Sequence, residues 1–480
     1  MLFKPSMYLF IAFLSFLSHL SFSNPLLVRV DRPSFRQLMV AMPLVATDKS
    51  SIELEKLAIE ARQELSHFLE FSGLFQVMPL EHYKTLLPRK KLSQLPFAEE
   101  GFRTLNLQSW KDIGAEALVL AKISEDSTGP ILEIRIADLY KGSSVVGKRY
   151  RLKSSPIVDS IKSFADHVLE HYTGAPGLFS SQIAFVGKSS PKADQQVYVS
   201  DVDGRNLRQM TTAPAPHISV AWSPDGKQLI YTSFESGRTE LFIMDYPSGK
   251  RRKLAAFKGL NSGGSFSPDG KWVVFTGSVG GNAEIYVMPR NGTTRQQLIR
   301  GVGLDVSPVF SPDGNYIAFV SGRYGNPHIF RGTLQWDQQG ARVVKDDRLT
   351  YAGWYNAGPS WSPDSQKIVF AGFDKDINRF DIFMMNSDGA NLERLTIRSG
   401  DNETPSWSPN GKMVVFQSNR TNNGKLRDVK SQPQLYRMNA DGSSQTLIPT
   451  GLYEAQTPSW GPQMKVFSRV AQSRFEKKRG

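Results

Sequence analysis

The chain has 480 residues, 40% hydrophobic and 21% charged, and its formal net charge is +13. These ordinary proportions exclude a disordered chain and a protein with many membrane spans. The Lys and Arg residues are scattered and do not form the basic patch with interspersed aromatic residues that is typical of nucleic-acid-binding proteins. The absence of cysteine excludes disulfides, thiolate metal sites and cysteine nucleophiles.

The first residues predict export. Lys4 precedes an apolar run over residues 7–20, and small residues follow at Ser21 and Ser23. This pattern is typical of a signal peptide, here residues 1–23, and the run is shorter than the roughly 20 apolar residues of a membrane anchor. A mature chain without cysteine suits the periplasm of a Gram-negative cell. Three matches to the N-glycosylation pattern leave eukaryotic secretion open, at Asn291, Asn402 and Asn419.

The part of the chain before residue 176 predicts a small α+β domain. A helix is expected over residues 49–71, because its apolar residues recur every three or four positions and Gly73 follows as a stop. A second helix is expected from Ser155-Pro156 to Gly174. Apolar extended segments predict strands at residues 26–31, 37–46, 74–78, 117–123 and 131–139.

The rest of the chain repeats one turn. The tetrapeptide Ser-Pro-Asp-Gly, or a close variant, recurs at spacings of 44, 44, 51 and 46 residues. A repeat of this length with about four short strands per unit is typical of a β-propeller blade. Pro and Gly set the backbone angles that let the next strand turn back, so the motif is expected to be a structural joint. The five turns begin at Ser223, Ser267, Ser311, Ser362 and Ser408.

The two ends of the repeat region predict a sixth blade. Three strands between residues 182 and 211 lack the first strand of a unit, and TPSWGP at 457–462 repeats TPSWSP at 404–409 after 53 residues. The C-terminal copy can supply the missing inner strand, which closes the ring and removes exposed strand edges. We therefore expect an α+β N-terminal domain over residues 24–175, an all-β six-bladed β-propeller over residues 176–468 and a solvated basic tail over residues 469–480.

Little in the sequence indicates catalysis or metal binding. A propeller-containing serine peptidase needs a Gly-x-Ser-x-Gly elbow, which is absent, and only 18 residues follow Pro462. The segment from Asp201 to Asn206 begins like a calcium loop, but Thr212 stands where the closing Glu would be, so a turn between strands is expected. We expect no catalytic residue, metal or cofactor. The alternatives are such a peptidase and a carbohydrate-binding propeller that stacks sugars on blade tryptophans such as Trp222, which we expect instead to pack between blades.

Five longer stretches are specific enough to indicate a family. They are WKDIGAEALVLAKI in the N-terminal domain, GAPGLFSSQIAFV at the domain junction, and SDVDGRNLRQMT, SPDGKQLIYTSFESGRTEL and FKGLNSGGSFSPDGKWVVFTG in the propeller. Together they resemble the TolB family of periplasmic propeller proteins over nearly the whole mature chain. The insertions near residues 333–342 and 421–431 and the basic tail depart from the family pattern.

The resemblance implies a monomeric, non-enzymatic adaptor of the Tol-Pal system. Such a protein binds a Pal-like peptidoglycan-associated lipoprotein through its propeller and a TolA-like inner-membrane protein through its mature N-terminus. It thereby supports outer-membrane integrity and constriction at division, and is peripheral to the outer membrane through its partners.

Two partner-binding regions are expected. The connections that precede the inner strands differ between units whose strands agree, and loops on a rigid ring usually carry binding residues. They predict a propeller mouth for the Pal-like partner, on loops outside the blade strands, formed by His217, Asn261, Asp305, Tyr355, Glu403 and Gln456. Residues 24–31 form either an edge strand or a free peptide. By resemblance to TolB, a TolA-like domain pairs there by strand addition with Leu26, Leu27, Val28 and Val30.

Overall fold

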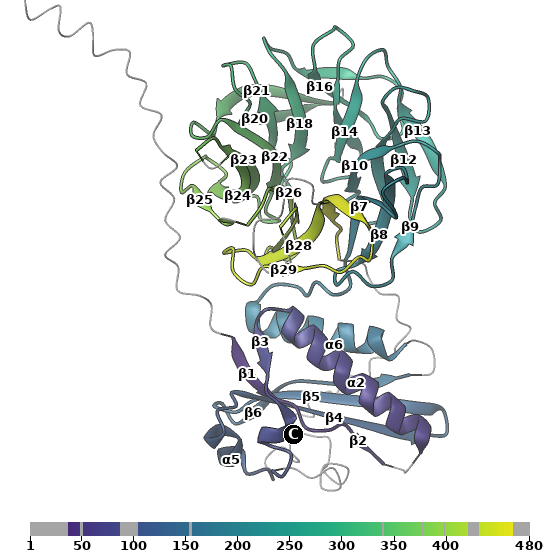
Figure 1. Cartoon of the computed structure of the whole chain (residues 1–480), viewed down its shortest axis with the longest axis vertical. Coiled ribbons are helices and arrows are strands. Elements are labelled where there is room, and N and C mark those ends of the chain that lie inside the picture. Colours follow the sequence, from purple (N-terminus) through teal and green to yellow (C-terminus); the bar gives the residue numbers. More distant parts are fainter. Residues whose placement is uncertain are drawn as a thin grey trace, which may run out of the picture.

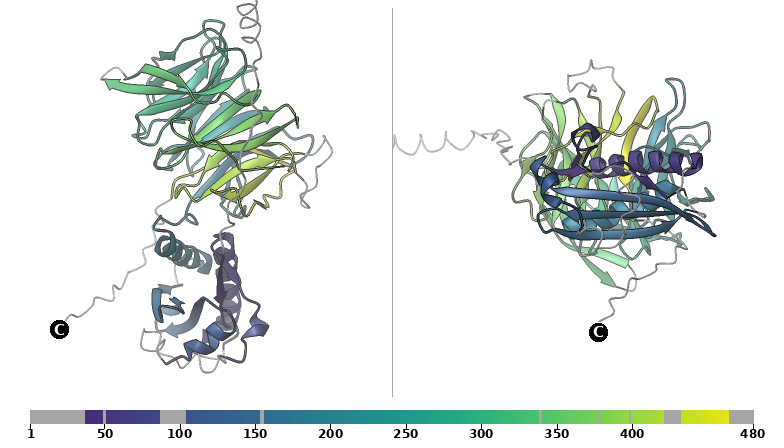
Figure 2. Two further views of the ribbon diagram at one scale, coloured as in Figure 1. Left: turned by 90° about the vertical axis from the view of Figure 1, so that its left-hand side faces the viewer. Right: turned by 90° about the horizontal axis from the view of Figure 1, so that it is seen from below.

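The structure, a computed structural model, describes residues 37–48, 51–86, 104–152, 156–337, 340–376, 378–397, 399–420 and 432–463. A small α+β domain stands beside a ring of six four-stranded sheets (Figure 1), which confirms the fold class expected from the sequence. Figure 2 shows the two parts from the side and from below. The predicted signal peptide, the basic tail and the insertion at 421–431 lie outside the described residues. Within the described ranges, no helix is both long and apolar enough to cross a membrane.

The small domain is built on one mixed sheet. Its strand order is β3-β1-β4-β5-β6, and β2 lies beside β4. Strand β1 pairs in parallel with β3 and β4, whereas β4, β5 and β6 form an antiparallel meander. The strands are β1 (Leu38–Ala41), β2 (Ala46–Thr47), β3 (Phe75–Val77), β4 (Ala117–Asp126), β5 (Gly129–Asp138) and β6 (Ser143–Arg151).

Two long helices, α2 (Ile52–Phe71) and α6 (Ile157–Thr173), cover one face of this sheet and lie between it and the ring (Figure 1). Both occupy the ranges that the sequence predicts. Helix α6 ends where Gly174 takes a left-handed φ of 68° and donates its N–H to the Glu170 carbonyl. The opposite face carries the short helix α5 (Leu107–Asp112) and the 3-10 turn η1 (Leu80–His82), which the sequence analysis did not predict.

The ring consists of six antiparallel blades, each numbered here from its inner to its outer strand. Blade 1 contains β30 (Glu454–Trp460), β7 (Gln182–Lys188), β8 (Gln196–Asp201) and β9 (Arg208–Gln209). Its inner strand comes from the C-terminal end of the repeat region and pairs with β7, so the predicted ring closure is confirmed. Blade 2 contains β10 (His217–Trp222), β11 (Gln228–Ser233), β12 (Glu240–Asp245) and β13 (Arg251–Ala255), and blade 3 contains β14 (Asn261–Phe266), β15 (Trp272–Gly277), β16 (Glu284–Pro289) and β17 (Gln296–Ile299).

The remaining blades have the same strand order. Blade 4 contains β18 (Asp305–Phe310), β19 (Tyr316–Ser321), β20 (His328–Asp337) and β21 (Gly340–Arg348). Blade 5 contains β22 (Tyr355–Trp361), β23 (Lys367–Asp374), β24 (Arg379–Asn386) and β25 (Glu393–Arg394), and blade 6 contains β26 (Asn402–Trp407), β27 (Met413–Ser418), β28 (Gln434–Asn439) and β29 (Thr446–Leu447).

The repeated turn joins the first and second strands of blades 2 to 6. In blade 2 the Ser223 hydroxyl donates to the Asp225 carboxylate at 2.6 Å and accepts the Gln228 N–H at 2.9 Å. Gly226 takes a φ of 67°, a left-handed conformation that glycine adopts without a steric penalty. The same Ser-to-acceptor bond recurs in blades 3 to 6. The motif is therefore a joint that fixes the reversal of the chain.

The insertion near residues 333–342 lengthens the outer hairpin of blade 4. Strands β20 and β21 continue past the usual blade length, and Trp336 donates its indole N–H to the Gly314 carbonyl at 2.8 Å. The Trp336 ring also lies 6.3 Å from the Trp272 ring of blade 3. The insertion thus fastens blade 4 against blade 3.

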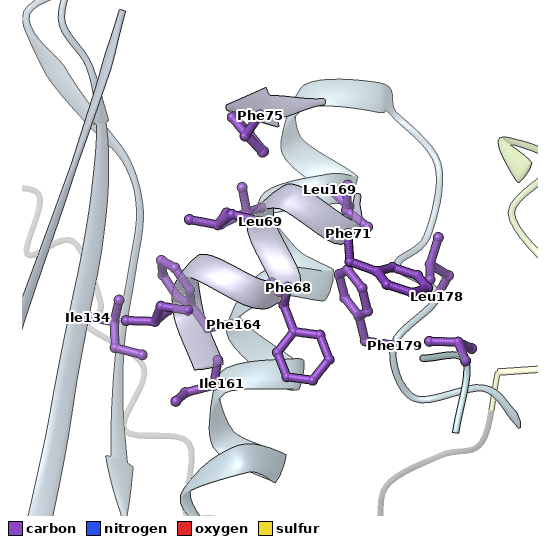
Figure 3. Packing of buried hydrophobic residues seen from close by; sticks show 14 of the residues in the cluster. Phe68, Leu69, Phe71, Phe75, Ile134, Ile161, Phe164, Leu169, Leu178 and Phe179 are labelled. Atoms are coloured by element: carbon purple, nitrogen blue, oxygen red, sulfur yellow. The ribbon is translucent and has the colours of Figure 1, made fainter. Parts of the chain in front are cut away.

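The two parts of the molecule share one hydrophobic core. Phe68 and Phe71 of α2 pack edge-on against Phe179 of the linking segment, with ring centroids 5.0 and 5.8 Å apart (Figure 3). The same cluster continues into blades 1 and 6 through residues such as Phe185 and Leu435. Burial of this much aromatic surface fixes the helices to the ring.

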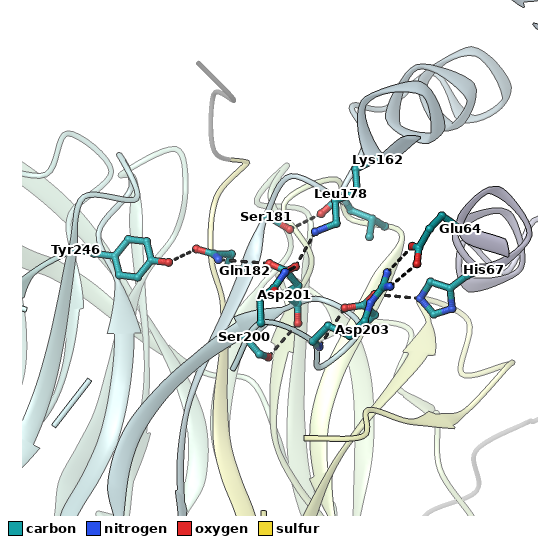
Figure 4. Close-up of polar contacts among 12 residues, drawn as sticks. Glu64, His67, Lys162, Leu178, Ser181, Gln182, Ser200, Asp201, Asp203 and Tyr246 are labelled. Atoms are coloured by element: carbon teal, nitrogen blue, oxygen red, sulfur yellow. Dashed lines mark hydrogen bonds and ion pairs between the residues drawn. The ribbon is translucent and has the colours of Figure 1, made fainter. Parts of the chain in front are cut away.

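Polar contacts surround that shared core (Figure 4). Lys162 of α6 donates to Asp201 at 2.6 Å, with both side chains nearly buried. Arg205 makes a bidentate pair with Glu64 of α2, at 2.7 and 2.9 Å, and also contacts Asp203. The segment from Asp201 to Asn206, which the sequence identified as a turn between strands, is therefore also the anchor of the small domain. We call these contacts and the aromatic cluster the junction.

Candidate protein-binding rim

Six inner strands surround the centre of the ring (Figure 1), and each begins with polar residues and ends with an aromatic one. The ladder between each inner strand and its neighbour is interrupted by a bulge, which increases local twist and re-aims side chains. One left-handed residue marks every bulge, namely Ser219, Gly263, Ser307, Gly358, Thr404 and Thr457. We call the end of the ring where the inner strands begin the rim.

The rim lies at the end of the blades opposite the junction. In blade 1 the inner strand begins beside the end of β7, where Ala455 pairs with Gly187. Asp201, which anchors the small domain, pairs with Gln182 at the other end of the same sheet. The small domain therefore leaves the rim uncovered.

Three of the six predicted mouth residues are buried structural groups. His217, Asn261 and Asp305 are the first residues of their inner strands and are fully buried, whereas the sequence analysis placed them on loops outside the strands. Asn261, for example, accepts the Phe257 N–H at 3.1 Å and donates to the Phe257 and Gly259 carbonyls. The expectation of solvated loop side chains is wrong here, because the first ladder pair of each blade buries them.

Asp305 shows what such a residue does. Its carboxylate accepts a hydrogen bond from Arg323 at 3.3 Å, and Arg323 also pairs with Asp346 at 2.7 Å. Burial raises the pKa of the Asp305 carboxyl, although Ser321 and Arg323 act in the opposite direction. The Asp305 carboxylate thus holds the loops of blade 4 in place through Arg323 and does not itself face solvent.

The other three predicted residues also lie on inner strands and not on loops as predicted, but they have access to solvent. Tyr355 is 36% exposed, and its ring meets Phe380 edge-on at 5.8 Å. Glu403 and Gln456 are half-buried on the inner strands of blades 6 and 1. Burial and the neighbouring Asp401 charge raise the pKa of Glu403, while Gln417 donates a hydrogen bond that lowers it. Tyr355, Glu403 and Gln456 can therefore contact a partner directly.

The structure adds an exposed aromatic group that the sequence analysis did not single out. Tyr324, Tyr351 and Trp354 are 69%, 75% and 54% exposed. They belong to connections at the rim end of blades 4 and 5, since the strands beside these connections pair at that end. Arg348 lies over both Tyr324 and Tyr351, at 5.9 and 4.8 Å. Together with Tyr355, these residues form what we call the rim aromatic cluster.

A cluster of this kind is suited to binding a protein. Tyr and Trp supply large contact areas at low entropic cost, and exposed aromatic groups on a monomer commonly mark interaction sites. Lys375, 5.8 Å from the Trp354 ring, adds positive charge at its border. The sequence signal that could have located the cluster is the aromatic density of YAGWYNAG, where the connections of the other units have at most one aromatic residue.

The predictions about the mature N-terminus and about metal binding concern regions other than the rim. Leu26, Leu27, Val28 and Val30 lie outside the described residues, so their pairing with a partner stays a prediction. Across the ranges described above, no group of three or more His, Cys, Asp or Glu side chains is placed to hold a metal ion.

The fold and the rim define a class: a six-bladed propeller with an N-terminal α+β domain and an aromatic-rich rim at the end of the ring opposite that domain. The model of the TolB beta propeller domain matches residues 169–464. The chain therefore belongs to the TolB beta-propeller family.

Similar proteins carry the same family name. The Tol-Pal system protein TolB of Alkalilimnicola ehrlichii is 32% identical over 201 residues, which cover 41% of this chain and 44% of that protein. The Hahella chejuensis protein of the same name is 32% identical over 242 residues, covering 49% and 52% of the two chains. This chain thus spans about half the length of the curated relatives that it matches. The crystal structure of TolB from Acinetobacter baumannii is 26% identical, with a TM-score of 0.73, and the match covers 89% of this chain and 97% of that one.

Proposed function

We propose that this protein is a periplasmic, non-enzymatic adaptor of the Tol-Pal system. It binds a Pal-like peptidoglycan-associated lipoprotein through the rim and a TolA-like inner-membrane protein through residues 24–31, and so supports outer-membrane integrity and constriction during division. Membership of the TolB family and relatives named as Tol-Pal system proteins support this assignment.

The observation that carries the proposal is the rim aromatic cluster. Its side chains are exposed although they are large and apolar, and the small domain leaves that end of the ring free. A protein partner would remove this surface from water, which is the main favourable contribution to association. In this proposal Tyr355, Glu403 and Gln456 contact the Pal-like partner, while His217, Asn261 and Asp305 hold the loops that present them.

Calorimetric titration of the mature chain with the soluble domain of the Pal-like lipoprotein tests the rim. Changing Tyr351 and Trp354 together to Ala should weaken binding at least tenfold, because buried aromatic anchors usually dominate interface energies. Tyr140→Ala is the matched control, since Tyr140 is a 68% exposed aromatic residue of the small domain. Unchanged affinity in the folded double variant would exclude the rim as the binding face.

The N-terminal assignment has a separate test. Deletion of residues 24–31 should abolish binding to a TolA-like domain and leave Pal-like binding intact. If TolA-like binding survives the deletion, the contact lies elsewhere on the molecule.

A further inference from the structure

Blades 2 and 3 carry an excess of positive charge that other blades lack. Residues 217–300 contain eleven Lys and Arg against six Asp and Glu, whereas residues 355–450 contain eleven against ten. Only part of the excess is a run in the sequence, at residues 250–253, and its other members lie up to 50 residues from Lys250. Folding brings them to the outer edge of two adjacent blades.

Six of the cations between residues 250 and 300 have no carboxylate within ion-pair distance among the residues that the structure describes. Arg251 and Lys253 do have one, since they pair with Glu235 and Glu240. The six without such a partner are Lys250, Arg252, Lys258, Arg290, Arg295 and Arg300, and we call them the basic strip. None of the six therefore forms a close ion pair with a described carboxylate, although the charge of Arg290 acts on the Asp225 carboxylate from a longer distance.

Contacts between the blades make the strip continuous. Arg252 of β13 donates to the Arg290 carbonyl and, at 3.2 Å, to Asn291 of blade 3. Arg295 lies 4.0 Å from the centre of the Phe257 ring, next to Lys258. The strip spans the height of the blades, from Lys250 in the β12–β13 turn to Lys258 and Arg300, which follow β13 and β17. Strand β13, which carries Arg252, lies on the perimeter of the ring away from the small domain (Figure 1).

Protection of a sheet edge does not account for this pattern. Charged residues on an outermost strand do prevent edge-to-edge pairing. However, β9, β25 and β29, the outermost strands of blades 1, 5 and 6, contain at most one cation each, and the three cations of β21 in blade 4 are accompanied by Asp346 and Asp347. Five of the six strip residues, moreover, lie in turns and connections, where no strand edge needs protection, and only Arg252 lies in a strand.

We propose that the basic strip binds an anionic membrane surface, which in the location given by the proposed function is the phospholipid leaflet that faces the periplasm. A convex row of cations without an enclosing pocket fits a planar array of phosphates better than one small anion. Each Lys or Arg near an anionic membrane contributes a favourable electrostatic free energy, and the sum for several such residues falls as the salt concentration rises. The strip would orient the ring with its perimeter toward the membrane and leave the rim free for a protein partner.

Co-sedimentation of the mature chain with vesicles tests this proposal. Vesicles of phosphatidylcholine with one third phosphatidylglycerol should bind the protein at low salt, and pure phosphatidylcholine vesicles should not. The variant Lys250→Gln, Arg252→Gln, Lys258→Gln and Arg300→Gln should lower the partition coefficient at least tenfold. The control variant Lys56→Gln, Lys84→Gln, Lys192→Gln and Lys412→Gln has the same net charge, also changes exposed residues, and should bind like the wild type.

The other outcomes overturn the proposal. Equal loss in both quadruple variants would show general attraction by net charge, and binding to neutral vesicles would show a different mode. Displacement by a few millimolar inorganic phosphate would indicate a small-anion site, and equal affinity for duplex DNA of the same charge would indicate unspecific polyanion binding. Pal-like binding measured on Lys250→Gln with Arg252→Gln, which lie outside the connections that lead into the inner strands, separates this inference from the proposed function, because it should be unchanged whether or not the vesicles bind.

Discussion

The junction and the rim lie at opposite ends of the same blades and use similar residues in opposite ways. Both combine aromatic rings with Arg side chains. At the junction Phe179 is buried and Arg205 is held by Glu64 and Asp203, whereas at the rim Tyr351 is largely exposed beside the half-buried Arg348. Removal from water makes the first set a source of stability, and exposure keeps the second set available for a partner.

The largest effect on stability is expected at Phe179. Phe179→Ala should lower the free energy of unfolding by about 4 kcal/mol, because it empties a buried site between α2 and blade 1. Urea titration followed by tryptophan fluorescence measures the change. A loss below about 1 kcal/mol would mean that the junction collapses around the cavity or contributes little.

The nearly buried ion pair of the junction should come next. Lys162→Met leaves Asp201 with only the weaker amide donors Gln182 and Asn206. We expect a loss of about 3 kcal/mol, since removing one partner leaves a nearly buried charge insufficiently paired. The double variant Lys162→Met with Asp201→Leu should recover part of that loss. If the double variant is less stable than the single one, the cost does not come from an unpaired carboxylate.

Acid should weaken the junction through Asp203. Burial would raise the pKa of Asp203, but the hydrogen bond from His67 and the Arg205 charge outweigh it and lower the pKa to about 2, below the ordinary 3.8. A lowered pKa contributes stability that is complete above the unfolded value and is lost as the pH falls toward 2. The loss should approach about 2 kcal/mol. The difference in free energy of unfolding between wild type and Asp203→Asn should therefore be smaller at pH 3 than at pH 7. An equal difference at both pH values would contradict the assignment.

The smallest effect on stability belongs to the rim. Trp354→Ala should change the free energy of unfolding by less than about 0.5 kcal/mol, because the ring is more than half exposed. Thermal unfolding compared with Phe179→Ala checks the contrast directly. A loss as large as that of Phe179→Ala would show that the rim is part of the core and not a free surface.

Much of the fold could be predicted because the repeat is local. The spacing of Ser-Pro-Asp-Gly gave five blades, and the two copies of TPSW gave the sixth blade and its closure. The candidate site was harder to predict. Tyr355 and its connection were identified, but Tyr324 comes from another connection, between β19 and β20, which only the folded blade brings to the same rim.

The sequence by itself determined the class of fold, the number of blades and the two helices of the small domain, because turns and apolar periodicity depend on neighbouring residues. Only the tertiary structure decided which polar residues are buried and what they bind. Asp305 is buried because the first ladder pair of blade 4 encloses it, with Arg323 as its partner, and Asp203 is anchored by α2, more than 130 residues earlier in the chain. Burial and long-range pairing depend on how distant segments meet, and no short stretch of sequence contains that information.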